Sequence, residues 1–355
     1  MLKQNDVVIP EKFKNHPIFN TLHKGVNFGF MSKRGYYEQP ETLKQPQLMA
    51  QCGINWSTLN VNICQENYAS RHIFQDYVFS SGERELMEMA KRLHDNGVHI
   101  LLKPCLTSLD GAWMGAVTFP VGNQIQGVQI DYWKDWFASF TEALKYYADF
   151  AERNQIEGLI IGAEYYGTEG RSAEWRKVID AVRCCYSGPI TYEFIIDSLQ
   201  TYSLDWFECL DFLSYSYYPP ARPLNRDLTQ YASSPRITLK DMVDFLEPNR
   251  KQIEDIVLRF GNKPIAFTEI GVRSAHGCTA LPSDFLAETT YDGEEQANYM
   301  EAVFQTYSQV PQWLGFYWWK WDETQDRPHY KDPAGDKGFT IQGKPAEKVM
   351  KKWFN

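Results

Sequence analysis

The stretch GLIIGAEYYGTEG (residues 158–170) begins as a continuous apolar run and turns polar at a glutamate, Glu164. An apolar run without strict alternation is typical of a strand that is covered on both faces of a parallel sheet. A carboxylate at the end of such a strand is costly, because its charge is partly removed from water. The position of Glu164 at the end of a buried strand therefore indicates a functional role for its carboxyl group.

Strand-like segments of the same kind recur along the chain, and helical patterns such as residues 86–93 and 136–147 separate them. Eight segments can be recognised, and they span residues 25–30, 54–63, 98–105, 158–164, 189–194, 211–218, 264–269 and 315–321. Eight strands that alternate with helices predict an α/β fold, a (β/α)8 TIM barrel. We expect one catalytic domain over residues 1–355, with residues 1–24 as an N-terminal lead-in and residues 345–354 as the last helix.

Composition narrows the class of protein. The 355 residues are 43% hydrophobic and 15% aromatic, which is typical of a compact globular chain. The net charge of −9 and the absence of a Lys and Arg cluster argue against a nucleic-acid partner. No run of about 18 apolar residues is present, so we expect no membrane span. The N-terminus lacks the apolar core of a signal peptide, which favours the cytoplasm unless a leader has been removed.

Cysteine and histidine give no sign of a metal centre. The seven cysteines include no CxxC pair and are expected to be free thiols. The seven histidines form no HxH or HExxH motif, so we expect neither a metal nor a cofactor. His276 and His329 fall in loop segments, where we expect them to be solvated.

A second glutamate has a place that matches Glu164. The segment KPIAFTEIGVRS (residues 263–274) is apolar up to Phe267 and ends in Glu269. If these are strands four and seven, both carboxyl groups lie at the C-terminal face of the barrel, across from each other. One carboxylic acid and one carboxylate are what glycosidic cleavage requires, at about 5–5.5 Å for retention and about 6.5–9.5 Å for inversion. The alternative is that each glutamate forms a buried salt bridge or caps a helix.

Aromatic residues indicate a sugar ligand, because the CH faces of a sugar stack on indole and phenol rings. In GFYWWKWD (residues 315–322) alternation places Trp319 and Trp321 on the same face as Tyr317. We predict Trp319 as the platform for the sugar at the cleavage point, with Trp321 as the alternative. Of the tyrosines that end strand six, we predict that Tyr217 donates a hydrogen bond to Glu269.

Further substrate contacts are predicted from polar and aromatic residues near strand ends. Lys103 either binds a sugar hydroxyl or pairs with a nearby acid. Asn60 and Asn62 on strand two are candidate ligand donors, and Trp113 follows strand three in a loop. An oligosaccharide or polysaccharide is therefore the expected partner.

The chain resembles glycoside hydrolase family 113. The resemblance is carried by KRGYY (33–37), LLKPCLTSLDGAWMG (101–115), residues 160–194, DFLSYSYYP (211–219), KPIAFTEIGVRS (263–274) and residues 315–354. It implies a retaining (β/α)8 glycosidase without a cofactor, with β-1,4-mannan and manno-oligosaccharides as substrates. It also implies that Glu164 is the acid/base and Glu269 the nucleophile.

Three positions depart from the pattern of these relatives and bear on the substrate. Cys105 and Met114 stand where the family tends to have His and Arg, and Ala163 precedes the acid/base where many members of the wider clan have Asn. Alternatives to a mannoside are therefore a β-glycoside of another sugar, such as a 2-acetamido hexoside, or a carbohydrate-binding barrel without catalysis. A Schiff-base enzyme built on Lys103 or Lys320 is a third alternative.

Overall fold

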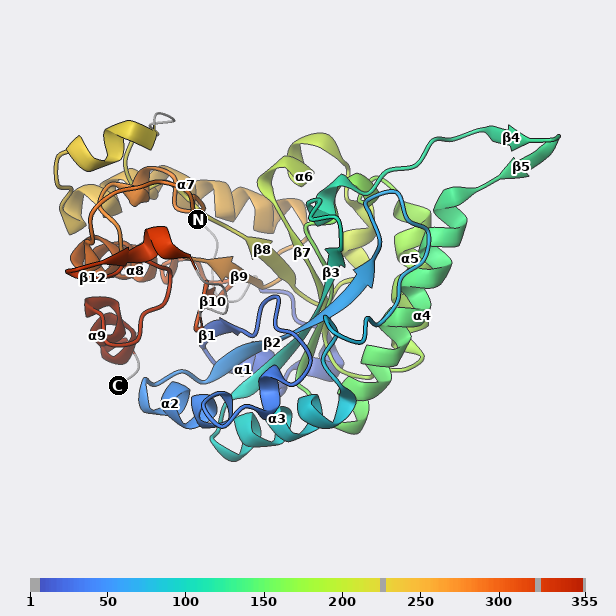
Figure 1. Cartoon of the computed structure of the whole chain (residues 1–355), viewed down its shortest axis with the longest axis horizontal. Helices are drawn as coiled ribbons and strands as arrows, with labels where there is room; N and C mark the ends of the chain where they lie inside the picture. Colours follow the sequence, from blue (N-terminus) through green and yellow to red (C-terminus); the bar gives the residue numbers. More distant parts are fainter. Residues whose placement is uncertain (1–6, 224–227, 323–326, 354–355) are drawn as a thin grey trace. The chain divides into compact units, whose positions relative to one another are not determined.

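Eight parallel strands close into one barrel with helices between them (Figure 1). The computed structural model describes residues 7–223, 228–322 and 327–353. The barrel strands are β1 (His23–Phe28), β2 (Trp56–Gln65), β3 (His99–Ser108), β6 (Gly158–Ala163), β7 (Ile190–Phe194), β8 (Leu213–Ser216), β9 (Ile265–Ile270) and β10 (Trp313–Trp318). Their order around the barrel is β1-β10-β9-β8-β7-β6-β3-β2. All eight predicted strands and the (β/α)8 fold are confirmed, with strand ends shifted by at most three residues.

Helices follow most of the strands. They are α1 (Pro17–Asn20), α2 (Gln45–Gln51), α3 (Glu83–Asp95), α4 (Tyr132–Arg153), α5 (Ser172–Arg183), α6 (Ile196–Thr201), α7 (Leu239–Arg259), α8 (Gly293–Tyr307) and α9 (Pro345–Lys352). Among residues 7–223, 228–322 and 327–353, we find no helix with both the length and the apolar character that crossing a membrane demands.

The chain divides into two compact units. Unit 1 comprises Met1–Phe28, Gln47–Ser57 and Tyr217–Asn355, and unit 2 comprises Gly29–Pro46 and Thr58–Ser216. The expectation of one catalytic domain over the whole chain stays a prediction. Residues 1–6 of the predicted lead-in and residue 354 of the predicted last helix lie outside the described residues.

Unit 2 contains β3, β6, β7 and β8 in register, with pairs such as Leu159 opposite Ile190 and Glu193 opposite Ser214. Helices α3, α4 and α5 lie on the outer side of these strands (Figure 1). The apolar stripes of α3 and α4 are buried as predicted: Leu86, Met89, Ala90, Leu93, Trp136, Phe140, Leu144 and Tyr147. These stripes pack the helices against the strands and so fix the strand ends that carry polar side chains.

A short hairpin in unit 2 was not predicted from the sequence. It consists of β4 (Asn123–Ile125) and β5 (Val128–Ile130), and it extends away from the strands of unit 2 (Figure 1). Its two-residue loop, Gln126 and Gly127, has φ values of 51° and 80°. Positive φ at both loop residues is the geometry of tight hairpins, so Gly127 was the available signal.

Unit 1 contains β1, β10 and β9, with Gly25 opposite Tyr317 and Phe316 opposite Phe267. Alternation along β10 follows the predicted pattern. Phe316 packs on Phe304 of α8, while the Tyr317 hydroxyl lies 3.1 Å from Nδ1 of His23. The helix-facing side of β10 is thus core, and the opposite face turns toward β1.

Candidate active site

Glu164 directly follows β6, and its backbone has a φ of 58°, in the left-handed region. Its N–H donates to the carbonyl oxygen of Glu193 at 2.9 Å, and its own carbonyl accepts from the N–H of Tyr166 at 2.8 Å. A glutamate in this conformation carries strain of about 1–3 kcal/mol, which persists only where the surroundings enforce it. The turn therefore fixes the glutamate at the C-terminal end of the strand.

The carboxyl group of Glu164 is held by two neutral donors. The indole N–H of Trp113 lies 3.3 Å from Oε2, and the Ser216 hydroxyl also forms a hydrogen bond to the carboxyl group. Burial raises the pKa of Glu164, and the nearby negative charge of Glu193 raises it further, while the bonds from Ser216 and Trp113 partly offset this rise. The balance favours the protonated acid more than in water.

Lys103 and Glu193 form a buried ion pair in the same unit. Their Nζ and Oε1 atoms are 2.7 Å apart, and the side chains are 2% and 0% exposed. Of the two readings for Lys103, pairing with an acid is the one observed. Glu193 was not predicted as part of the site, although it lies on the same face of β7 as Thr191. The two charges act in opposite directions on the pKa of Glu164.

The two asparagines of β2 are buried and bonded to the protein. The amide nitrogen of Asn62 donates to the carbonyl oxygens of Ser32 at 2.9 Å and Phe79 at 3.0 Å. Both of its N–H groups therefore hold loops, and the prediction of a ligand donor at Asn62 was wrong. Asn60 donates to the Thr58 hydroxyl at 3.1 Å and accepts from the Cys105 thiol at 3.4 Å. A ligand role for Asn60 stays a prediction.

Trp113 is the exposed aromatic residue beside Glu164. Its side chain is 47% exposed, and its ring stacks on that of Tyr166 with a centroid distance of 6.4 Å and an angle of 25°. Tyr166 was not predicted as part of the site. It lies two positions after Glu164, in the turn that follows the strand, and this position was the available signal. Substrate contact at Trp113 stays a prediction, and its indole is both a hydrogen-bond donor and an apolar surface.

Glu269 lies near the end of β9 in unit 1. Its Oε1 accepts a hydrogen bond from the Tyr218 hydroxyl at 2.8 Å. The prediction of Tyr217 as this donor was wrong, because the Tyr217 hydroxyl lies 2.9 Å from that of Tyr307 in α8. Tyr217 also packs on Phe267, with ring centroids 4.8 Å apart. Successive side chains point to opposite faces, so Tyr217 enters the helix layer and Tyr218 reaches the glutamate.

Trp319 and Trp321 differ in exposure. Trp319 is half-buried, and its N–H donates to the carbonyl oxygen of Ile270 at 2.6 Å, next to Glu269. Trp321 is fully buried, and its N–H donates to the carbonyl oxygen of Asn27 at 2.9 Å. The exposed surface of Trp319 keeps it as the predicted sugar platform. The alternative at Trp321 has no exposed ring face to offer.

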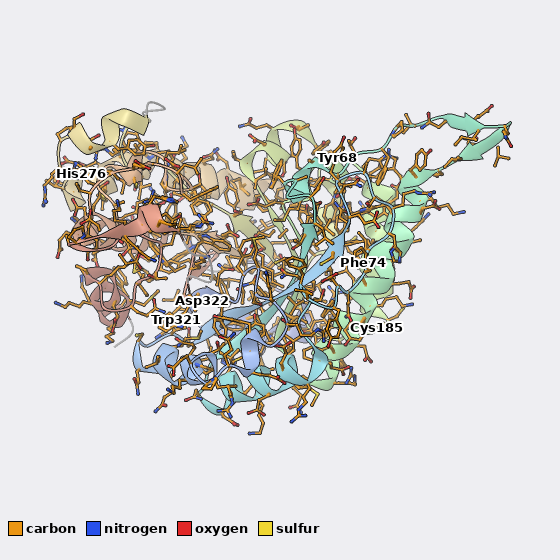
Figure 2. All side chains as sticks on the ribbon, in the orientation of Figure 1. Tyr68, Phe74, Cys185, His276, Trp321 and Asp322 are labelled. Carbon is orange, nitrogen blue, oxygen red and sulfur yellow. The ribbon has the colours of Figure 1, made fainter. Side chains whose placement is uncertain are left out.

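His276 is buried, contrary to the expectation of a solvated loop histidine. Its Nε2 lies 2.7 Å from the carbonyl oxygen of Ser234, and its Nδ1 lies 3.1 Å from Asp292 Oδ2 and 3.4 Å from Glu295 Oε2. In Figure 2 it lies well away from Trp321 within unit 1. His329 is half-buried, with Nε2 2.8 Å from the carbonyl oxygen of Phe285.

The side chains of His276, Asp292 and Glu295 have ligand atoms within 4.8 Å of one another, close enough for a metal ion. However, Glu295 already accepts hydrogen bonds from the N–H of Gly277 at 2.9 Å and the hydroxyl of Thr279 at 2.6 Å. These bonds tie a loop to the start of α8. The cluster is therefore accounted for as a structural network.

Comparison with known proteins assigns the family. Residues 26–344 match the model of Glycoside Hydrolase Family 113. The chain belongs to this family. It is a glycoside hydrolase, and its partner is a carbohydrate. None of the curated proteins matches the chain.

Solved structures agree with this assignment. A complex of a GH113 β-1,4-mannanase has 25% identity and a TM-score of 0.77, and the match covers 94% of this chain and 99% of that one. The GH113 β-mannanase from Alicyclobacillus acidocaldarius in complex with ManMIm has 25% identity and a TM-score of 0.76, covering 95% and 98%. A β-glucuronidase from Ruminococcus gnavus has 13% identity, a TM-score of 0.58 and coverage of 94% and 49%, so it shares the fold alone.

Proposed function

We propose that this GH113 protein hydrolyses β-1,4-mannosidic bonds by double displacement, with Glu164 as acid/base and Glu269 as nucleophile. The contrast between the two strand-end glutamates carries the proposal. Burial raises the pKa of Glu164, whereas a tyrosine hydroxyl donates to Glu269 at 2.8 Å. Such a split between a proton-holding acid and a hydrogen-bonded carboxylate is what retaining glycosidases require.

In the first step, Glu164 protonates the glycosidic oxygen while Oε2 or Oε1 of Glu269 attacks the anomeric carbon. The leaving sugar departs with the proton, and a covalent glycosyl-enzyme forms on Glu269. Glu164, now a carboxylate, then takes a proton from water as the water attacks the same carbon and releases Glu269. The mechanism requires a separation of about 5–5.5 Å between the two carboxyl groups.

Tyr218 supports the role of Glu269 because a donated hydrogen bond favours the charged form of a carboxyl group. The hydroxyl also limits the rotation of the carboxyl group. Tyr218 was one of the tyrosines at the end of strand six that the sequence offered for this bond, but its neighbour Tyr217 was chosen.

The mannosidic preference rests on the family relatives. Two GH113 structures that match nearly the full chain are β-1,4-mannanases. Trp319 is half-buried and adjoins Glu269 through the Ile270 carbonyl, so its ring is suited to stack on the sugar that becomes attached to the enzyme. Trp113 adjoins Glu164 and is suited to contact the leaving sugar.

Azide rescue separates the two roles. Glu164→Ala and Glu269→Ala should each lower turnover by about 10²–10⁴-fold on an oligosaccharide. With an activated aryl β-mannoside and sodium azide, Glu164→Ala should give the β-mannosyl azide, because Glu269 still forms the intermediate. Glu269→Ala should give the α-mannosyl azide, because azide attacks the substrate directly. The same anomer from both variants would refute the assignment.

A panel of substrates identifies the sugar. We expect manno-oligosaccharides and 4-nitrophenyl β-mannoside to be cleaved faster than the matching glucoside, galactoside and N-acetylhexosaminides. Faster cleavage of an N-acetylhexosaminide would favour the alternative suggested by Ala163. The Schiff-base alternative is weakened for Lys103, because its ammonium group is paired with Glu193 at 2.7 Å.

A further inference from the structure

The peptide group after Glu164 is held by a buried hydroxyl. The N–H of Tyr165 donates to the Tyr192 hydroxyl at 2.9 Å, and this hydroxyl donates in turn to Oε1 of Glu169 at 2.8 Å. The side chains of Tyr165, Tyr192 and Glu169 are all fully buried in unit 2. The bond from Tyr165 to Tyr192 and the bond from the Glu164 N–H to the Glu193 carbonyl together fix the backbone on both sides of Glu164, which has a positive φ.

Packing leaves the Tyr192 ring little freedom. The ring lies edge-on to Trp175 and Trp206, with centroid distances of 5.0 Å in both cases. It also passes close to Gly162, where a Cβ atom would lie 2.8 Å from Cε2 of Tyr192. A side chain at position 162 would force this ring to move, so the glycine of the strand permits the approach.

Glu169 is anchored at its backbone as well as its side chain. Its carbonyl oxygen accepts from the indole N–H of Trp206 at 3.0 Å, and its N–H donates to the Tyr166 carbonyl at 3.2 Å. Within the described residues, the other carboxyl oxygen of Glu169, Oε2, is buried and has no hydrogen-bond partner with normal geometry. Burial raises the pKa of Glu169 to about 7, while Ser198 and Tyr192 partly offset the rise. Burial of an ionisable acid costs free energy. Packing of the turn alone therefore does not explain a glutamate at this position.

We propose that Glu169 is a positioning residue for Glu164, acting through the Tyr192 hydroxyl and the Tyr165 peptide group. By accepting the hydrogen bond that the Tyr192 hydroxyl donates, Glu169 directs an oxygen lone pair of Tyr192 at the Tyr165 N–H. This bond keeps Glu164 in the left-handed conformation that sets the direction of its carboxyl group. The inference rests on the acid/base role proposed for Glu164, and it adds a residue five positions further along the chain.

The alternative is a network that supports the fold without affecting catalysis. The two cases differ in how kcat/KM, which reports the first step, depends on the leaving group. An acid out of position impairs cleavage when the leaving group needs a proton, as a sugar does, and matters little when the leaving group departs as a stable anion, as dinitrophenolate does. A loss of folded protein lowers both rates equally.

The test compares Tyr192→Phe with Tyr186→Phe in the full chain. Tyr186 is the matched control, because it is also buried and its hydroxyl donates to a carbonyl, that of Ile156 at 2.7 Å, outside this network. We expect Tyr192→Phe to lower kcat/KM, which reports the first step, on a manno-oligosaccharide by about 10- to 100-fold. We expect less than about a threefold change in kcat/KM on 2,4-dinitrophenyl β-mannoside. Tyr186→Phe should have the wild-type kcat/KM on both substrates.

Glu169→Ala and Glu169→Gln give a second test that does not depend on the folding of Tyr192→Phe. The alanine variant removes the acceptor and should show the same leaving-group-dependent loss. The glutamine variant keeps an oxygen acceptor and should recover rates within about threefold of wild type. Circular dichroism and thermal melting give the folded fraction used to normalise each rate.

Equal losses on both substrates, or no loss in the folded variants, would overturn the positioning role. Glu164→Ala, measured in parallel, keeps this failure separate from failure of the proposed function. If Glu164→Ala shows the leaving-group dependence of an acid/base and Tyr192→Phe does not, only the role of Glu169 is refuted. If Glu164→Ala keeps full activity on the oligosaccharide, the acid/base assignment itself is refuted.

Discussion

The hydroxyl of Tyr218 donates a 2.8 Å hydrogen bond to Oε1 of Glu269, while the adjacent Tyr217 is bonded to Tyr307 in the helix layer. Two neighbouring tyrosines with opposite directions provide a matched pair of variants. One hydroxyl contacts the proposed nucleophile and the other does not. Removing each in turn isolates the contribution of this single hydrogen bond to catalysis.

Tyr218→Phe should lower kcat/KM by about 10- to 100-fold, because a hydrogen bond to a charged group contributes about 1.5–3 kcal/mol. Tyr217→Phe removes the same atom one position earlier and should leave kcat/KM within about threefold of wild type. Steady-state kinetics on a manno-oligosaccharide measures both. Equal effects of the two substitutions would show that the bond to Glu269 has no special part in catalysis.

The two tryptophans after β10 should separate binding from stability. Trp319→Ala should lower kcat/KM by at least about tenfold, or ~1.4 kcal/mol, because its exposed ring surface is the proposed sugar platform. Its melting temperature should change little. Trp321 is fully buried, so Trp321→Ala should cost about 3–5 kcal/mol of unfolding free energy. Denaturant unfolding and kinetics on both variants check this, and an unaffected Trp319→Ala enzyme would contradict the platform role.

The eight strands could be predicted because each is a short apolar run between helical patterns, and the barrel covers both strand faces. The strand-end positions of Glu164 and Glu269 followed from the same pattern. The hydrogen-bond partners of these two glutamates could not be predicted in this way. Choosing Tyr217 over Tyr218 required the strand face to be known at a residue beyond β8, where alternation is easily displaced by one position.

Other parts of the site depend on contacts between distant segments. Asn62 looked like a ligand donor on its strand, but its amide group holds the loops of Ser32 and Phe79. Glu169 was not predicted as part of the site, and its partner Tyr192 lies 23 positions later in the sequence. Such partners are set by tertiary packing, and periodicity along the chain carries no information about them.

Glu169 should make stability fall as pH rises. Its pKa is raised from 4.5 to about 7, so between these values the unfolded chain loses the proton while the folded protein keeps it. The folded state then loses up to about 3 kcal/mol of stability between pH 4.5 and pH 7, and nothing more above that range. Glu169→Gln lacks this titration. Its unfolding free energy relative to wild type should therefore increase across the same window, as urea titrations at a series of pH values would measure. A constant difference would contradict the raised pKa.

Glu157, just before β6, should have the opposite effect on the pH dependence of stability: its stabilisation should be lost as pH falls. Burial alone would raise its pKa, but hydrogen bonds from His94 and His99 and from the Ile100 N–H hold the pKa at about 2. Because this pKa lies below the usual 4.5, the stabilisation is present above pH 4.5 and is lost as pH falls through about 2.

Glu157→Gln should accordingly lose up to about 3 kcal/mol of unfolding free energy at neutral pH, and the loss should shrink as the pH is lowered toward 2. Glu142→Gln is the control, because its pair with Lys145 is exposed and contributes about 0–1 kcal/mol. Glycosidase rates of the folded Glu157→Gln variant should equal those of wild type, since Glu157 precedes β6 and Glu164 follows it. A large loss of kcat in the folded variant would mean that the two ends of this strand are coupled.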